Sequence, residues 1–238
     1  MSGRKAKALR RASRVTNQPG KHHRLQIPLP QFRWTGGLAV GLVSGLLTAA
    51  TASALPEGGV VVSGSGSVSQ PSPTTVIVHQ GSDKLILNWQ GFGIRSNEGV
   101  RFQQPGASSV ALNRVVGAEP SEIMGALSAN GRIFLTNPNG VLFGPSSRVD
   151  VGSLLATTLQ IKDSDFLAGN YKFTQSMTHP LASVVNEGEV VAAPGGFISF
   201  VGPGVMNRGT ITARLGTIAL GAAEGVILDL RGDGLSHW

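Results

Sequence analysis

Asn130-Gly-Arg-Ile-Phe-Leu-Thr-Asn-Pro-Asn-Gly-Val-Leu-Phe-Gly144 is the most informative segment of this 238-residue chain. It contains two short apolar runs, residues 133–135 and 141–143, on either side of Asn137-Pro138-Asn139-Gly140. Pro138 fixes φ near the value required at the second position of a β-turn. The Asn137 side chain can bond the backbone two residues on, and Asn139 and Gly140 tolerate left-handed conformations. The segment therefore predicts strand, tight turn, strand, and its local chemistry alone does not separate an ordinary hairpin loop from a specialised motif.

The positive charge of the chain is concentrated at its N-terminus. The net charge is +7, but nine of the 20 Lys and Arg lie between Arg4 and Arg33, and no acidic residue precedes Glu57. From Leu55 onward, 11 basic and 13 acidic residues give a net charge of −2. A nucleic-acid partner would require a basic face on the folded part of the chain. The sequence therefore predicts no nucleic-acid partner.

An apolar run at residues 38–50 follows the basic segment. A run of about 13 residues is too short to cross a bilayer but fits the apolar region of a signal peptide. Ala52-Ser53-Ala54 then provides a small-x-small cleavage pattern. We expect residues 1–54 to be a Sec signal peptide with an extended basic leader, cleaved between Ala54 and Leu55. An uncleaved membrane anchor is the alternative.

Residues that could support catalysis are few and scattered. The chain has no Cys, which excludes thiolate nucleophiles and Cys-ligated metal sites. His79, His179 and His237 show no spacing typical of metal ligands. The acidic residues of the mature region are scattered, and Asp163 and Asp165 lie close together in a segment expected to form a hairpin. We expect no cofactor, no metal and no enzymatic activity, with a β-helical polysaccharide-active enzyme as an alternative.

Two heptapeptides near the C-terminus match each other. Asn186-Glu-Gly-Glu-Val-Val-Ala192 and Asn207-Arg-Gly-Thr-Ile-Thr-Ala213 share the pattern Asn-x-Gly-x-aliphatic-x-Ala, 21 residues apart. Each precedes an apolar strand, at residues 197–201 and 217–220, and we expect a further copy to begin at residues 226–230. Short strands with Gly and Asn turns at a period near 20 predict a solenoid, here a parallel β-helix with coils about 4.8 Å apart. A β-sandwich with similar hairpins is the alternative.

The remaining segments yield coarser expectations. The N-terminal part of the mature region is expected to cover the open end of the stacked sheets, because an uncovered end exposes unpaired backbone. Residues 63–72 are rich in Gly and Ser and predict a loose coil. Residues 119–127 are expected to form a helical turn, and the more polar residues 163–178 a projecting hairpin.

Several motifs together resemble one known family. Asn137-Pro138-Asn139-Gly140-Val141 resembles the "NPNGI" motif of the two-partner secretion domain, also called the haemagglutination activity domain. That domain begins the filamentous-haemagglutinin-like exoproteins of Gram-negative bacteria. The resemblance extends from about Leu55 to the C-terminus, and five further stretches carry it in the family's order: residues 87–92, 100–105, 111–115, 148–152 and 165–171.

The resemblance implies an all-β fold, a right-handed parallel β-helix with an N-terminal cap and an extra-helical hairpin. It implies a secretion and folding module at residues 55–238. Such a module targets an exoprotein or adhesin to a dedicated outer-membrane β-barrel transporter, through that partner's periplasmic domains. The product reaches the medium or the cell surface via the periplasm. The expected secretion motif is Asn137, Pro138, Asn139 and Gly140, and the supporting motif positions are Asn88, Trp89, Gln104, Pro105, Asn113 and Arg114.

The sequence departs from the family in two places. Gln104-Pro105-Gly106-Ala107 stands where many members carry a second turn, "NPNL". The sequence stops at Trp238 where family exoproteins continue, so we expect residues 55–238 to be the start of a longer exoprotein, with an unusually short family member as the alternative.

A direct adhesin that binds a host receptor or glycan is an alternative function. Arg231-Gly232-Asp233 spells the integrin-binding tripeptide, although Gly and Asp here are also ordinary turn residues. For the central asparagines, contact with the transporter and a role in folding are both open. We favour folding, because Pro-Asn-Gly chemistry already explains the turn.

Overall fold

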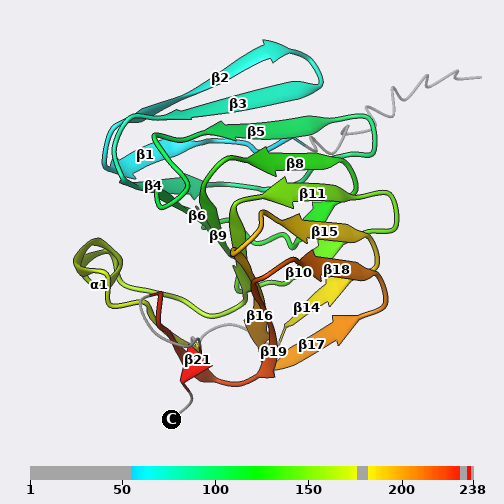
Figure 1. Cartoon of the computed structure of the whole chain (residues 1–238). Coiled ribbons are helices and arrows are strands. Elements are labelled where there is room, and N and C mark those ends of the chain that lie inside the picture. The colour runs from blue at the N-terminus through cyan, green and yellow to red at the C-terminus, as the bar shows by residue number, and fades with distance from the viewer. Residues whose placement is uncertain (1–54, 176–181, 231–234, 237–238) are drawn as a thin grey trace, which may run out of the picture. The chain divides into compact units, whose positions relative to one another are not determined.

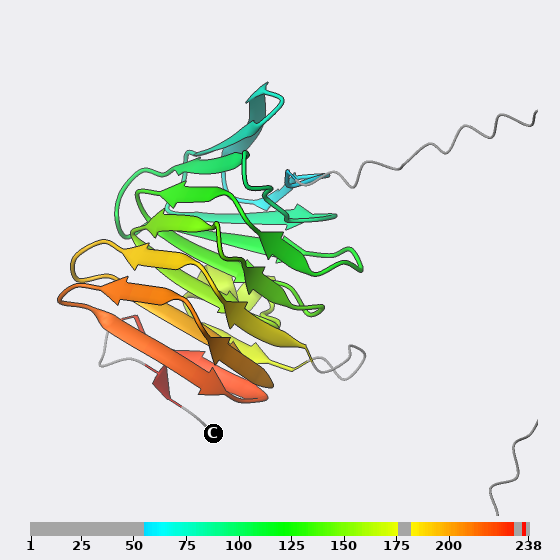
Figure 2. The same ribbon diagram turned by 90° about the vertical axis from the view of Figure 1, so that its right-hand side faces the viewer.

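The computed structural model describes residues 55–175, 182–230 and 235–236, most of which lie in short β-strands. Three largely parallel sheets contain most of the strands. From β7 (Ser121–Ile123) to β19 (Thr217–Ala222) the chain visits these sheets in turn, interrupted once by residues 158–182 (Figure 1). Successive coils lie one above another, as Figure 2 shows from the side. The predicted parallel β-helix is therefore confirmed, and the β-sandwich alternative is wrong.

Sheets 1 and 2 have seven strands each and sheet 3 has four. Sheet 1 consists of β1 (Val60–Ser63), β4 (Lys84–Trp89), β6 (Val110–Val115), β9 (Arg132–Thr136), β12 (Ser153–Thr157), β16 (Phe197–Gly202) and β19 (Thr217–Ala222). Sheet 2 consists of β2 (Gly66–Ser72), β3 (Thr75–Gln80), β5 (Gly99–Gln103), β8 (Ala126–Ala129), β11 (Arg148–Val151), β15 (Glu189–Ala192) and β18 (Thr210–Ala213). Sheet 3 consists of β7 (Ser121–Ile123), β10 (Val141–Phe143), β14 (Ser183–Asn186) and β17 (Gly204–Asn207).

The 21-residue repeat corresponds to one coil. Asn186 pairs with Asn207 in sheet 3, and Ala192 pairs with Ala213 in sheet 2, as the matching heptapeptides predict. Side chains alternate between the two faces of each strand. One face of every sheet points into a common bore, where buried residues such as Leu135, Phe143 and Val190 form the main core.

The N-terminal strands cover the first coil, as expected. β1 runs antiparallel to β4, and β2 runs antiparallel to β3, so both stacks end in a reversed strand. Residues 63–72 are not a loose coil, because residues 66–72 form β2. This strand is mostly exposed and therefore lacks the apolar alternation by which a strand is recognised in sequence.

Sheet 1 carries a second apolar layer on its outer face. The outer layer comprises α1 (Asp163–Ala168), β13 (Lys172–Thr174) and β20 (Gly225–Leu228), and β13 pairs antiparallel with β20. Phe134 of β9 lies under it, with ring centroids 6.2 Å from Phe166 and 5.2 Å from Tyr171. Sheet 1 is therefore apolar on both faces, as parallel sheets usually are.

Three further local predictions are wrong, in each case because partners distant in sequence decide the structure. Residues 119–127 contain β7 and β8 in place of a helical turn. The segment expected to be a projecting hairpin contains α1 and β13, which pack on sheet 1. Outside the three main sheets, β20 pairs antiparallel with β13 and with β21 (Leu235–Ser236). Residues 226–230 begin no further coil, because β20 turns back to β13. Within residues 55–175, 182–230 and 235–236, no helix is long and apolar enough to cross a membrane.

Two cations of sheet 1 fix the ends of α1. The Arg114 guanidinium donates to the carbonyl oxygen of Ile161 at 2.9 Å and to the Asp163 carboxylate at 2.5 Å, and it also donates to Asn88 Oδ1 at 3.3 Å. Lys84 Nζ donates to the Leu167 carbonyl oxygen at 2.6 Å, near the C-terminus of the helix. The cation near the last carbonyls and the carboxylate in the first turn both have the favourable sign for the helix dipole.

Replacing Arg114 by Ala is expected to loosen the outer layer. The substitution removes three hydrogen bonds from a side chain that is only 18% exposed, which is expected to cost about 2 kcal/mol of unfolding free energy. Arg208→Ala is the matched control, because its ion pair with Glu187 is exposed and is expected to contribute less than about 1 kcal/mol. Urea unfolding and limited proteolysis of residues 160–175 measure the effect. Equal losses for the two variants would contradict this role of Arg114.

Candidate functional site

The central turn joins sheet 1 to sheet 3. It leads from β9 to β10, and these strands do not pair with each other, so the turn is a corner of the coil and no hairpin loop. The Gly140 N–H donates to the Asn137 carbonyl oxygen at 3.1 Å and closes a four-residue turn. Gly140 has φ of 120°, where a side chain would be strained. The predicted strand, tight turn and strand are confirmed.

Asn137 is fully buried and uses both ends of its amide. Its Nδ2 donates to the Glu119 carbonyl oxygen and to Ser121 Oγ, both at 3.0 Å. Its Oδ1 accepts from the Asn139 backbone N–H at 2.9 Å, which is the bond expected for this residue in a turn. The side chain thus connects its own corner to the preceding coil.

Asn139 makes a second connection to the same coil. Its Nδ2 donates to the Gly117 carbonyl oxygen at 2.9 Å. Gly117 in turn packs against the coil before it, where a Cβ on Gly117 would lie 2.0 Å from the Gln90 carbonyl oxygen. The side-chain amides of Asn137 and Asn139 therefore fix residues 117–121. This segment is irregular as far as Pro120, and its last residue, Ser121, begins β7.

The supporting motif positions lie in three other places. Trp89 and Asn113 meet inside the bore, where Trp89 Nε1 donates to Asn113 Oδ1 at 3.0 Å. Gln104 is buried at a corner between sheets 2 and 1, where Nε2 donates to Gln80 Oε1 at 3.0 Å, while Pro105 beside it is exposed. Asn88 and Arg114 are on the outer face of sheet 1, where Arg114 contacts α1.

The candidate residues therefore form no single cluster. They are structural contacts at successive levels of the solenoid, and most of them connect one coil to the next. Their partners Gln80, Gly117, Ser121 and Asp163 are missing from the sequence-based set, because each belongs to another coil or to the outer layer. No group of three or more His, Asp or Glu side chains suited to a metal ion occurs in residues 55–175 and 182–230.

The expected signal cleavage site is only partly described. Ala52 and Ala54 lie outside the described residues, as does Arg231-Gly232-Asp233. Leu55 is described and is buried at the start of the main core.

Comparison with known proteins decides the family. Residues 52–235 match the TPS secretion domain, where TPS denotes two-partner secretion. The chain belongs to this family. The crystal structure of the HMW1 secretion domain from Haemophilus influenzae has the same fold, with a TM-score of 0.70 and 32% sequence identity over 73% of this chain and 46% of that one. The family resemblance and the function it implies, a domain that targets an exoprotein to its transporter, are thereby confirmed.

Two curated relatives are longer proteins. A heme/hemopexin-binding protein from Haemophilus influenzae strain Rd is 37% identical over 175 residues, which are 70% of this chain and 19% of the relative. A second heme/hemopexin-binding protein of Haemophilus influenzae is 36% identical over 120 residues, 50% of this chain and 13% of the relative. The chain thus spans about a fifth or less of the length of these relatives.

The central turn, residues 137–140, is called the TPS turn from here on. It is expected to stabilise the domain mainly through Asn137. Asn137→Ala removes bonds from a fully buried amide and leaves buried partners unpaired, which is expected to cost about 3 kcal/mol. Asn139→Ala removes one inter-coil bond from a half-buried side chain and is expected to cost about 1 kcal/mol. Asn170→Ala, at an exposed position, is the control and is expected to stay within about 0.5 kcal/mol.

Urea unfolding of the three variants and the wild type measures these differences. A smaller loss for Asn137→Ala than for Asn139→Ala would contradict the inter-coil role of the buried amide.

Proposed function

We propose that residues 1–54 carry the chain across the inner membrane through the Sec machinery and are removed after Ala54. Residues from Leu55 onward then engage the periplasmic domains of an outer-membrane β-barrel transporter, and the exported chain reaches the medium or the cell surface. TPS domains pair with an outer-membrane transporter, and this family membership is the observation that carries the proposal. The basic segment, apolar run and small-x-small pattern support the first step.

We further propose that Asn137, Pro138, Asn139 and Gly140 serve export by allowing the domain to fold. Asn137 and Pro138 are buried, so in the folded domain neither side chain offers a surface to a transporter. The contacts of the turn instead join consecutive coils. Each added coil buries another apolar layer, so folding outside the cell would favour outward movement of the chain.

No specific observation favours a direct adhesin or a polysaccharide-active enzyme over this function. The heme and hemopexin named for the two relatives are ligands of those longer proteins. The tripeptide that motivates an adhesin lies outside the described residues.

Export of the whole chain is expected to depend on the transporter. We would express it in a Gram-negative host with and without its cognate outer-membrane transporter, and blot medium and periplasm. The medium is expected to contain the chain, beginning at Leu55, only when the transporter is present. Equal export without the transporter, or periplasmic retention in both strains, would overturn the proposed function.

A further inference from the structure

Sheet 3 starts later than the other two sheets. Sheets 1 and 2 have three strands each before the level of β7, but sheet 3 has β7 as its first strand. At the earlier levels this face is covered by irregular segments, including residues 90–95 and 117–120. Along the outer edge of β7 the only pairing in the described chain is one parallel bridge between Ile94 and Ile123.

A groove of about 410 Å³ lies on this face. Its lining includes apolar side chains, among them Leu55, Phe92, Ile94 and Pro120. Three of these four are buried residues of the main core, so the groove lies directly beside the first coils. The Ile94 N–H donates to the Glu122 carbonyl oxygen at 2.9 Å and the Ile94 carbonyl oxygen accepts from the Met124 N–H at 2.6 Å, so the irregular segment takes the place of a strand here. An apolar recess lined by such a segment is a surface on which an extended peptide can lie.

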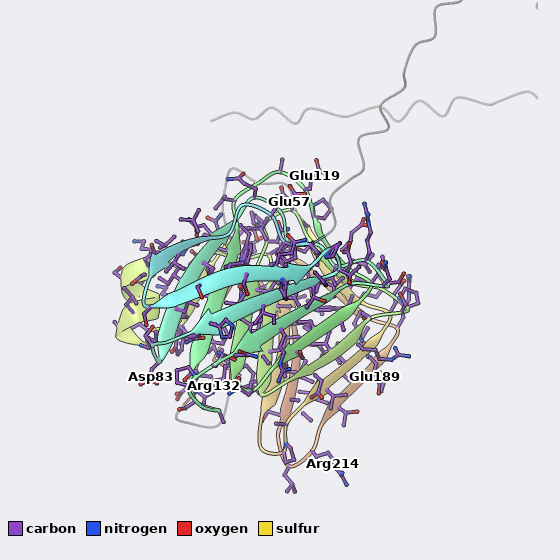
Figure 3. The ribbon with its side chains drawn as sticks, turned by 90° about the horizontal axis from the view of Figure 1, so that it is seen from above. Glu57, Asp83, Glu119, Arg132, Glu189 and Arg214 are labelled. Carbon is purple, nitrogen blue, oxygen red and sulfur yellow. The ribbon has the colours of Figure 1, made fainter. Side chains whose placement is uncertain are left out.

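Three exposed carboxylates border the groove: Glu57, Glu119 and Glu122. They come from three different segments, and Figure 3 shows Glu57 and Glu119 near one another at the same end of the molecule. None of the three forms an ion pair within residues 55–175 and 182–230. Arg95 is the one basic residue in the lining, so the groove has a net negative charge.

The TPS turn supports one wall of this groove. Asn137 bonds the Glu119 carbonyl oxygen and Ser121 Oγ, and Asn139 bonds the Gly117 carbonyl oxygen. The opposite wall is fixed to the same segment, because Gly117 packs directly on the Gln90 backbone. The buried turn can therefore affect the binding of a partner in the groove without contacting that partner, because it sets the position of Glu119 and Pro120.

We propose that this groove is a docking surface for the transporter, and that its occupant is an extended periplasmic segment of the transporter carrying Lys or Arg beside apolar side chains. The proposal rests on the transporter-dependent export proposed above. The alkyl parts of Lys and Arg would cover the apolar floor while their charged ends reach the three carboxylates. Complementary charge of this kind accelerates encounter and selects the partner.

Charge reversal in the whole chain tests the proposal. Glu119→Lys combined with Glu122→Lys is expected to reduce transporter-dependent export by about tenfold or more. The matched control is Asp150→Lys combined with Glu224→Lys, which makes the same charge change at exposed positions outside the groove and is expected to export normally. Because the side chains of Glu119 and Glu122 form no hydrogen bond or ion pair with residues 55–175 or 182–230, the double variant is expected to keep the wild-type midpoint of urea unfolding.

A photo-crosslinking residue at position 122 or 150 of the otherwise unchanged chain provides a second readout. A cross-link to the transporter from position 122 and none from position 150 is expected. Two results would overturn the docking role of the groove and leave the proposed function intact. One is equal transporter-dependent export of the wild type and the Glu119/Glu122 variant, and the other is cross-links from position 150 only. Absence of transporter-dependent export in the wild type would overturn both.

Discussion

The buried side-chain amide of Asn137 is the interaction on which the corner between sheets 1 and 3 depends. A buried amide that lacked partners would be strongly unfavourable, and here both its nitrogen and its oxygen are bonded. Two of its partners belong to the preceding coil, and the backbone N–H of Asn137 bonds the Thr157 carbonyl oxygen of the following one. One residue therefore fixes the spacing of three successive levels.

Buried amides recur at other levels of the solenoid. Asn113 accepts from Trp89 in the bore, Gln104 donates to Gln80 at another corner, and Asn186 donates to Asn207 one coil further on. Apolar layers alone supply the burial but specify register weakly, because one aliphatic side chain can replace another. The hydrogen bonds of these buried amides have a defined geometry, so they select one alignment of the coils. The same corner that orders the coils also positions the segment beside the acidic groove.

The sequence allowed the solenoid, the turn and the coil length to be predicted, because each depends on residues that repeat or lie close together. The two heptapeptides pair residue for residue in the structure. The outer layer could not be placed in this way, because α1 has only six residues, too few to show helical periodicity. Arg114 illustrates the same limit, since its partner Asp163 is 49 residues away. Most of the candidate residues contact another coil or the outer layer, and these distant partners leave no local signal in the sequence.

Native-state hydrogen exchange of Asn137→Ala tests most directly whether the TPS turn orders the preceding coil. In the wild type, the Ser121 N–H bonds the Gly140 carbonyl oxygen at 3.0 Å, and the segment before it is fixed by the two asparagines. The variant is expected to exchange faster at residues 117–123 as well as at residues 137–141, although the two segments are far apart in sequence. Faster exchange confined to residues 137–141 would contradict it, because the turn would then be a local structure without influence on the stacking of the coils.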